Sequence, residues 1–353
     1  MTTTLNDIID NLTIIFKQIV ANKITAGDKG KVLFLYKNTE LEAASVTTYK
    51  SAIFTLSDTT LAKYIKQLFK GGCKKVIVLQ YPSNISGVVS LINEMKSDFD
   101  WILSADSDAQ TDIIAYAKEN KKFTMTYNNQ ADSRYVCSFS NPSATYINED
   151  GTTSTLSGVA LIPVLGGWAC GCPYNMAIDG KVFDELKDVT MPSAYNAGQL
   201  VLIKEEEGVR FANECNTLTT TSSTLTDDMK SLAISEGMQR VEIDLIKGYR
   251  QGYKGKYKNS YDNQCLFYNA VKHGYFRELE NVGIEILDKN YDNTIGTDVE
   301  TQRNKWLTSG KSEAADWDEN KVKEMTYKRE VIALADVKFL AGMGPLQITV
   351  EMF

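Results

Sequence analysis

Residues 59–80 read TTLAKYIKQLFKGGCKKVIVLQ, and this stretch decides the fold class. Apolar side chains recur at helical spacing from Leu61 to Phe69, and the pair Gly71-Gly72 ends the predicted helix. The chain then turns directly into Lys75–Gln80, an apolar run of strand length. A helix followed at once by a buried strand is the repeating unit of an α/β fold.

The same alternation extends on both sides of this unit, from residue 31 to residue 127. Right-handed crossovers make such a sheet mainly parallel, with helices on its faces. Two later apolar runs are expected to extend the sheet. The predicted elements are the strands Lys31–Tyr36, Lys75–Gln80, Asp100–Leu103, Phe123–Tyr127, Tyr135–Phe139 and Val159–Leu165, and the helices Thr59–Lys70, Ser86–Met95 and Ala109–Asn120.

The pattern changes after about Thr190. An acidic turn, Glu205–Gly208, separates two short strands in a hairpin pattern, and Thr226 is expected to cap a long amphipathic helix. The chain is therefore predicted to be α/β, or α+β overall. The elements expected in this second region are the strands Gln199–Ile203 and Val209–Cys215, the helices Thr226–Lys247, Asp262–Glu280 and Thr297–Leu307, and the closing strands Arg329–Leu340 and Leu346–Phe353.

Composition places the chain among ordinary globular proteins. It has 353 residues, enough for two domains, of which 43% are hydrophobic and 24% charged. The formal net charge of −7 disfavours a general nucleic-acid binder, which needs a basic footprint. Residues 1–10 lack the features of a secretory signal. Pro163 and Gly166-Gly167 interrupt the uncharged stretch Gly151–Ile178, so its apolar part is predicted to be a buried strand and not a membrane span.

Several candidate chemical features have simpler structural explanations. The glycines around Lys29 lack the spacing and the preceding strand of a phosphate-binding loop. The only histidine, His273, has no nucleophile motif near it, and Cys170-Gly171-Cys172 has no second cysteine pair to complete a metal site. Asp106 and Asp108 follow a strand, where ligand groups often lie, but capping of the following helix is the favoured explanation. The sequence therefore predicts no catalytic residue, no cofactor and no metal.

The segment Lys247–Lys258 (KGYRQGYKGKYK) combines basic residues with tyrosines and contains no acid. Such a pattern can bind single-stranded nucleic acid through charge and base stacking. The acidic balance of the whole chain argues against that function. A positive patch for an acidic protein neighbour and a solvated loop both stay open.

Each end of the chain carries an extended segment: Thr13–Ala21 (TIIFKQIVA) and Leu346–Phe353 (LQITVEMF). In the second segment apolar and polar residues alternate, so that Leu346 and Met352 share one face. A terminal strand frays unless it is tied into a sheet. Pairing within the chain's own sheet is the default. The alternative is pairing with a neighbour's sheet, where main-chain hydrogen bonds give affinity.

Four features follow one another in the C-terminal third. They are the strand-and-turn text Gly208–Thr219 (GVRFANECNTLT), a long helix, a helix that opens with Asp262-Asn263-Gln264 and ends in GYFREL at 274–279, and the closing strand pair. In this order they resemble the tail sheath family of contractile phages and of R-type, diffocin-like bacteriocins. Near the start, Thr13–Ala21 followed by Ala26-Gly27 and a strand looks like the N-terminal arm of that family, although the usual Pro-Gly before the arm is absent.

This resemblance implies a structural protein without a catalytic site. Such a subunit polymerises helically around a tail tube in a metastable extended state and contracts to drive the tube through a target cell envelope. The implied partners are other copies of the chain, the tail tube protein, and baseplate and tail terminator or collar proteins, with no nucleic acid and no stable membrane association. Assembly is implied in the host bacterial cytoplasm, followed by a place in the tail of a virion or of a released phage-tail-like particle.

The resemblance also implies a domain organisation and contact residues. It implies an N-terminal arm at 1–25, an inserted outer α/β domain at 26–195 that includes the first inner strand, an inner tube-facing domain at 196–340, and a donated strand at 341–353. The arm and the donated strand are implied to complete sheets of neighbouring subunits. The implied strand-exchange residues are Ile14, Ile15, Phe16, Ile19, Val20, Leu346, Ile348, Val350 and Met352; the implied hinge residues are Gly342 and Gly344; and the implied tube contacts are Lys321, Lys323, Lys328 and Arg329, with Lys247–Lys258 second.

Overall fold

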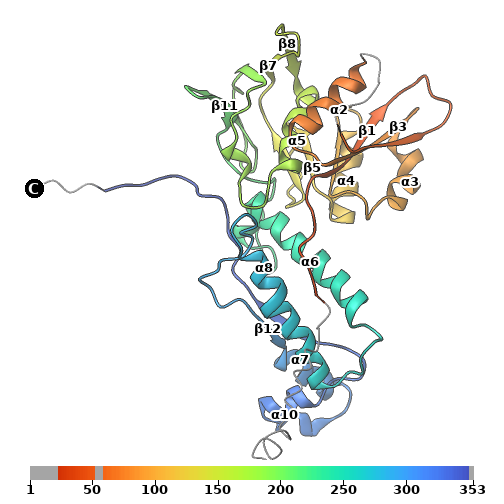
Figure 1. Cartoon of the computed structure of the whole chain (residues 1–353), viewed down its shortest axis with the longest axis vertical. Helices are drawn as coiled ribbons and strands as arrows, with labels where there is room; N and C mark the ends of the chain where they lie inside the picture. The colour runs from red at the N-terminus through yellow and green to blue at the C-terminus, as the bar shows by residue number, and fades with distance from the viewer. Residues whose placement is uncertain (1–22, 52–58, 350–353) are drawn as a thin grey trace, which may run out of the picture. The chain divides into compact units, whose positions relative to one another are not determined.

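The computed structural model describes residues 23–51 and 59–349 (Figure 1). The chain forms two compact units. The first consists of Met1–Thr25, Leu245–Tyr275 and Thr294–Ala335, and the second of Ala26–Asp244, Phe276–Asn293 and Asp336–Phe353. Neither unit is one continuous stretch of sequence, and the domain boundaries implied by the resemblance stay predictions.

A four-stranded sheet forms the centre of the second unit. Its strands are β1 (Lys31–Lys37), β2 (Ser45–Tyr49), β3 (Lys75–Tyr81) and β4 (Trp101–Ser104), in the order β2-β3-β1-β4. Strand β1 is parallel to β3 and β4, whereas β2 is antiparallel to β3. The mainly parallel sheet is therefore confirmed. The sequence did not reveal β2, because its residues are mostly exposed and polar.

Two more parallel strands continue this arrangement. Strand β5 (Thr124–Tyr127) pairs with β6 (Val136–Phe139). The backbone N–H of Ile102 in β4 donates to the carbonyl of Phe123 at 2.9 Å, so the start of β5 lies beside β4. The two strands form where they were predicted, but as a separate two-stranded sheet that, within the described residues, only an isolated bridge between Trp101 and Phe123 connects to β4.

Helices cover both faces of the sheet. Successive side chains of β1 point to opposite faces, so β1 contributes to two apolar layers. Val32 and Phe34 belong to an apolar layer shared with α2 and α5, and Leu33 and Leu35 to a layer shared with α3 and α4 (Figure 1). A strand buried on both faces is expected to be apolar, as the buried middle of β1, residues 32–35, is. The helices are α2 (Thr60–Lys70), α3 (Val89–Glu94), α4 (Gln110–Asn120) and α5 (Ile162–Gly171).

One predicted strand is wrong, because Val159–Leu165 is helical. A 3-10 turn, Gly158–Leu161, leads directly into α5. A continuously apolar run has no period of its own, so its pattern cannot separate a buried strand from a buried helix. Pro163 suits the first turn of a helix. The glycines of α5 let its backbone approach α2 closely: a Cβ on Gly71 would lie 2.4 Å from the carbonyl carbon of Gly167.

Antiparallel strands complete the second unit. Strand β7 (Ser143–Ile147) lies between β8 (Thr153–Ser157) and β9 (Leu186–Val189), three strands that the sequence pattern did not predict. Strands β10 (Leu202–Glu205) and β11 (Gly208–Phe211) form an antiparallel hairpin. The predicted hairpin around the acidic turn is confirmed.

The long helix begins later than expected. Helix α6 spans Leu232–Gly252, whereas Thr226 precedes only a short 3-10 turn and its side chain makes no capping hydrogen bond. The hydroxyl of Ser231 and the carboxylate of Glu214 instead accept hydrogen bonds from first-turn N–H groups of α6, at 3.2 and 2.7 Å. These side chains satisfy donors that a helix start leaves unpaired.

Helices dominate the first unit. The predicted helix Asp262–Glu280 is confirmed as α7, a π-helical turn and the short α8, and the predicted helix near Thr297–Leu307 is confirmed as α9. The expected strand Arg329–Leu340 is much shorter in the structure, where only β13 forms. The bounds are α7 (Tyr261–Ala270), α8 (Arg277–Leu279), β12 (Thr294–Thr297), α9 (Val299–Thr308), α10 (Glu319–Glu324) and β13 (Ala333–Asp336).

The described elements make a mixed α/β protein, as predicted, but with several small sheets where one extended sheet was expected. Within residues 23–51 and 59–349, no helix combines the length and the apolar character needed to cross a membrane. Exchange of strands between copies stays a prediction.

Candidate assembly interfaces

The C-terminal segment is fixed to its own unit as far as Leu340. Phe339 forms an antiparallel bridge with Leu287, and the backbone N–H of Leu340 donates to the carbonyl of Ile286 at 3.0 Å. Just before them, the Lys338 ammonium contacts the Asp288 carboxylate at 2.9 Å. The salt bridge and the short stretch of pairing define where the attached part of the chain ends.

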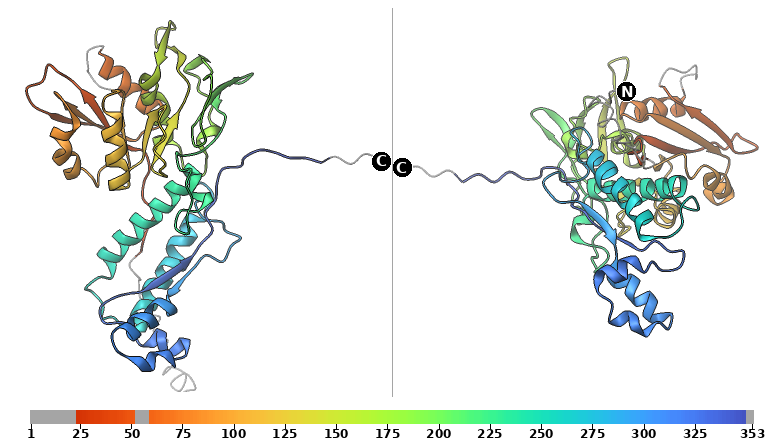
Figure 2. Two further views of the ribbon diagram at one scale, coloured as in Figure 1. Left: turned by 180° about the vertical axis from the view of Figure 1, so that it is seen from behind. Right: turned by 60° about the horizontal axis from the view of Figure 1, so that its bottom comes forward.

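Beyond Leu340 the described chain is unpaired. All residues from 341 to 349 are exposed, and none of them joins a strand or forms a backbone hydrogen bond within the described ranges (Figure 2). Leu346 and Ile348 expose 83% and 70% of their surface. Residues 346–349, the described part of the predicted closing strand, therefore do not pair with any described strand of their own chain.

The two predicted hinge glycines have different surroundings. A Cβ on Gly342 would lie 2.4 Å from the Cβ of Ala177, so only glycine fits there without a shift. A Cβ on Gly344 would meet nothing within 4 Å. The crowded glycine, Gly342, is thus next to the attached part of the chain, and the uncrowded one, Gly344, is two residues further along.

Strands β12 and β13 form a sheet of only two strands. All four residues of β13 are exposed, and Leu334 exposes 62% of its surface. Two strands alone are marginal in water, and their unpaired edges are templates for a further strand. Within the described part of the chain, no third strand joins this sheet.

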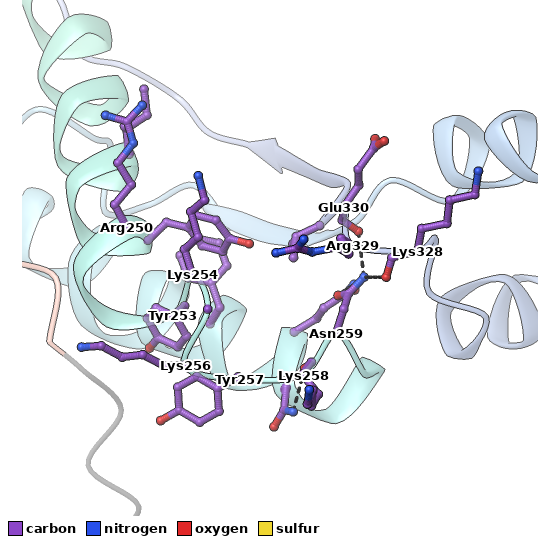
Figure 3. Close-up of a pocket in the computed structure, with 17 residues that line it drawn as sticks. Arg250, Tyr253, Lys254, Lys256, Tyr257, Lys258, Asn259, Lys328, Arg329 and Glu330 are labelled. Carbon is purple, nitrogen blue, oxygen red and sulfur yellow. Dashed lines mark hydrogen bonds between the residues drawn. The ribbon is translucent and has the colours of Figure 1, made fainter.

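A basic groove of about 1120 Å³ lies in the first unit, between the end of α6, the start of α7 and the segment before β13 (Figure 3). The name "basic groove" is used for it below. Its walls carry six cationic side chains and a single carboxylate, that of Glu330, which is itself paired with Lys305 outside the groove. The cationic side chains are Arg250, Lys254, Lys256, Lys258, Lys328 and Arg329.

Aromatic packing and one amide hold the groove walls. The ring of Phe267 lies edge-on to Tyr253 with centroids 5.1 Å apart, and burial raises the pKa of Tyr253. The side-chain amide of Asn259 donates to the carbonyls of Lys328 and Glu330 at 3.1 and 3.0 Å (Figure 3). Asn259 thereby fixes one wall of the groove to the start of α7.

The four predicted tube contacts divide into two places in the first unit. Lys321 and Lys323 are on α10, where Lys323 contacts Glu319 at 3.7 Å. Lys328 and Arg329 line the basic groove together with residues of the Lys247–Lys258 run. The structure therefore brings together two basic stretches that are separate in sequence.

The second unit contains a buried ionic cluster, but it leaves no room for a substrate. Glu236 pairs with Lys29 and accepts from the indole N–H of Trp101 at 2.9 Å. Arg240 contacts Asp244 at 2.6 Å. The space beside the cluster is about 10 Å³, less than a water molecule needs. The cluster binds α6 to the sheet and has no access for chemistry.

Metal chemistry finds no support in the described residues. All six cysteines are free thiols, four of them buried. Among residues 23–51 and 59–349, no cluster of three or more His, Cys, Asp or Glu side chains has a metal-binding arrangement. The interfaces above, and not a cavity with reactive groups, are the candidates for function.

Solved structures share this fold. The whole chain aligns with the helical sheath of the anti-feeding prophage in its contracted state, with a TM-score of 0.62 and 15% identity, over 100% of this chain and 99% of that one. It also aligns with the PVC sheath complex of an extracellular contractile injection system in its contracted state, with a TM-score of 0.63 and 10% identity, over 99% of both chains. At these identities the likeness is one of fold.

A sequence relative is similar to the chain over almost its whole length. No protein-family model matches the chain. The tail sheath protein of Clostridium phage phiCD119 is 24% identical over 365 aligned residues, which cover 97% of this chain and 99% of that protein. The chain is thus similar over almost its whole length to a tail sheath protein.

The predicted site residues fall into three groups. Leu346, Ile348, Gly342 and Gly344 are in the exposed C-terminal segment, and the four tube candidates are in the first unit. The remaining strand-exchange residues lie outside the described residues: Ile14, Ile15, Phe16, Ile19, Val20, Val350 and Met352. No sequence pattern indicated β12, whose four residues include Gly296.

Proposed function

We propose that the chain is a sheath subunit, which polymerises into a helix of many copies around a tail tube, is held in a metastable extended state, and contracts to drive the tube through a target cell envelope. Head-to-tail contacts that do not close on themselves generate helical filaments. Free energy stored at assembly supplies the work, because the contracted lattice buries more surface than the extended one. Baseplate and terminator or collar proteins are the further partners, and they control when contraction starts and where the polymer ends.

The connection between copies is proposed to be strand donation. The single observation that carries this proposal is the unpaired C-terminal segment, in which Leu346 and Ile348 are exposed on one face. Within the same chain, the two-stranded sheet β12–β13 offers unpaired edges to an incoming strand. Main-chain hydrogen bonds would give affinity and the alternating apolar side chains would give register. The N-terminal arm, 1–25, is proposed as the second donated segment.

The donated segment needs a joint to keep its pairing while subunits rotate. Gly342 and Gly344 are proposed as this joint, because glycine backbone adopts conformations that other residues avoid. The firm attachment at Phe339–Leu340 ends immediately before them. Rotation would then be absorbed over a few residues, and the donated hydrogen bonds would survive contraction.

Contact with the tube is proposed to be polar and weak enough for sliding. The inner domain at 196–340 is proposed to face the tube through Lys321, Lys323, Lys328 and Arg329. Exposed charge pairs contribute little each and are screened by salt. Such a surface can hold the extended sheath in register without fixing it permanently.

Deletion of 346–353 tests the proposal. The truncated chain is expected to fold, because the described part of this segment is exposed and makes no backbone hydrogen bonds within the described chain. Electron microscopy should then reveal tubular polymers of the intact chain and only discrete particles of the truncated one. A matched control chain has the same eight residues in an order that destroys the alternation, and it should also fail to polymerise. Normal tubes from the truncated chain would refute strand donation.

A further inference from the structure

The sequence contains one run of acidic residues and one run of basic residues that differ most from the mixed charge of the rest. Glu205-Glu206-Glu207 is the only place where three acidic residues are adjacent, and Lys247–Lys258 is the densest basic run without an acid. The structure places the first at the tip of the β10–β11 hairpin and the second on the wall of the basic groove. One chain thus carries a narrow acidic projection and a basic hollow.

The acidic tip is rigidly mounted. At the base of the hairpin, Phe211 is buried and its ring lies edge-on to Phe183, with centroids 5.5 Å apart. At the tip, Gly208 has a φ of 133°, a conformation that favours glycine and closes the turn tightly. Arg210 pairs with Glu205 and contacts Glu207 at 3.4 Å. Arg210 therefore contacts two of the three carboxylates, and the tip keeps an excess of negative charge.

The basic groove has the opposite imbalance. Its six cations repel one another across a shared hollow, and the carboxylate of Glu330, the only one on its walls, is already paired with Lys305. Such an arrangement is unfavourable in isolation, and a complementary anionic partner relieves it. Arg250, Lys254 and Arg329 are all exposed, so a protruding group can reach them. Arginine also binds carboxylates with two parallel hydrogen bonds.

We propose that the basic groove of one copy receives the Glu205–Glu207 turn of a second copy. The inference rests on the proposed function, because a helical polymer requires two different, complementary surfaces on each subunit. It replaces the tube contact proposed above for Lys328 and Arg329 by a contact between copies, and it leaves Lys321 and Lys323 on α10 for the tube. The contact steers and orients subunits through charge, while the donated strand supplies the lasting connection.

A charge swap in the full chain tests this contact in the absence of tube protein. Arg329→Glu and Glu206→Lys each place like charges opposite one another, and each is expected to weaken self-association about tenfold or more. The variant with both changes restores opposite charges and is expected to recover most of the lost association. Sedimentation at several protein concentrations measures it. Rising salt should weaken association of the wild type and of the double variant.

Matched controls change the same charges elsewhere. Lys289→Glu and Glu42→Lys are at exposed positions outside the groove and the turn, and both should associate like the wild type. Circular dichroism and thermal melting verify that every variant folds, which is expected because all four positions are exposed.

Three results would overturn the proposal. They are a double variant that does not recover, a Glu206→Lys chain that associates like the wild type, and groove variants that lose only binding to added tube protein. The last result would assign the groove to the tube. A wild-type chain that forms small oligomers but no tubes would count against the proposed function alone, since the swap is still readable in those oligomers.

Discussion

Lys29 and Glu236 form a buried ion pair between the start of β1 and helix α6, and their side chains expose only 9% and 7% of their surface. The Glu236 carboxylate also accepts a hydrogen bond from the indole of Trp101. A charge this deep in the protein is tolerated only while its partner is present. The pair therefore makes the position of α6 on the sheet depend on two side chains.

Removal of one member of this pair should be costly. Lys29→Met leaves the Glu236 carboxylate buried without its counter-charge, and the expected loss is about 3–5 kcal/mol of unfolding free energy, measured by urea denaturation. Lys29→Met combined with Glu236→Gln should recover part of it, since no lone charge remains. Lys74→Met removes the exposed pair with Asp28 and should cost about 1 kcal/mol or less. Equal effects of the buried and exposed changes would contradict this view of the pair.

The contact between α2 and α5 should tolerate no side chain. A Cβ on Gly171 would lie 2.4 Å from the carbonyl carbon of Gly72, and neither backbone can move away alone. Gly171→Ala is expected to destabilise the protein by about 1–3 kcal/mol, measured by chemical denaturation. Gly274→Ala is the matched control, because nothing lies within 4 Å of its Cβ, and it should change stability by about 0.5 kcal/mol at most. Similar losses at both positions would show that backbone clash is not the cause.

The alternation of the C-terminal segment predicts that the same substitution at two adjacent positions has different effects on polymerisation. Ile348→Asp puts a charge on the face proposed to be buried in another copy, and it should raise the protein concentration needed for polymerisation about tenfold or more. Thr349→Asp puts the same charge on the other face and should have a much smaller effect. Neither change should alter the melting temperature of the isolated subunit, because both residues are exposed. Equal effects on polymerisation would exclude a strand with one buried face.

Acid should release a contact between two loops of the second unit. Asp132 accepts hydrogen bonds from the backbone N–H groups of Thr220 and Thr219, at 3.0 and 2.7 Å, and these hold its pKa well below the usual range. Because the folded-state pKa is lowered, the contribution to stability is complete above the unfolded-state pKa of about 3.9 and falls as the pH drops below it. Asp132→Ala should therefore melt below the wild type at pH 6, and the difference should shrink toward pH 2.5. A difference independent of pH would exclude the carboxylate as its source.

The regular α/β part of the fold could be predicted because its signals are local. The apolar spacing of α2, its glycine stop and the apolar run of β3 are adjacent in sequence, and each feature has one structural meaning. The stretch Val159–Leu165 failed because a fully apolar run fits both a strand and a buried helix. Its Pro163 and its glycines were the available evidence for a helix that packs closely on α2.

The candidate interfaces could be predicted only in part. The alternation of Leu346–Phe353 predicted a closing strand, but 346–349 form no strand in the described chain and Leu346 and Ile348 are exposed. Pairing of this segment with another copy stays a prediction. The basic groove could not be predicted, because Lys254 and Arg329 are brought together by the Asn259 hydrogen bonds and not by any sequence pattern. Tertiary structure alone reveals that two basic runs share one surface.

The open edges of the two-stranded sheet have a consequence for the order of construction. In a subunit that has an unpaired strand and an incomplete sheet, nothing within the subunit controls when strand pairing begins. Any two copies made in the same cell could therefore pair with each other. Under strand donation, the first ring therefore has to be templated by a preformed structure, and every later ring inherits its geometry from the one beneath it.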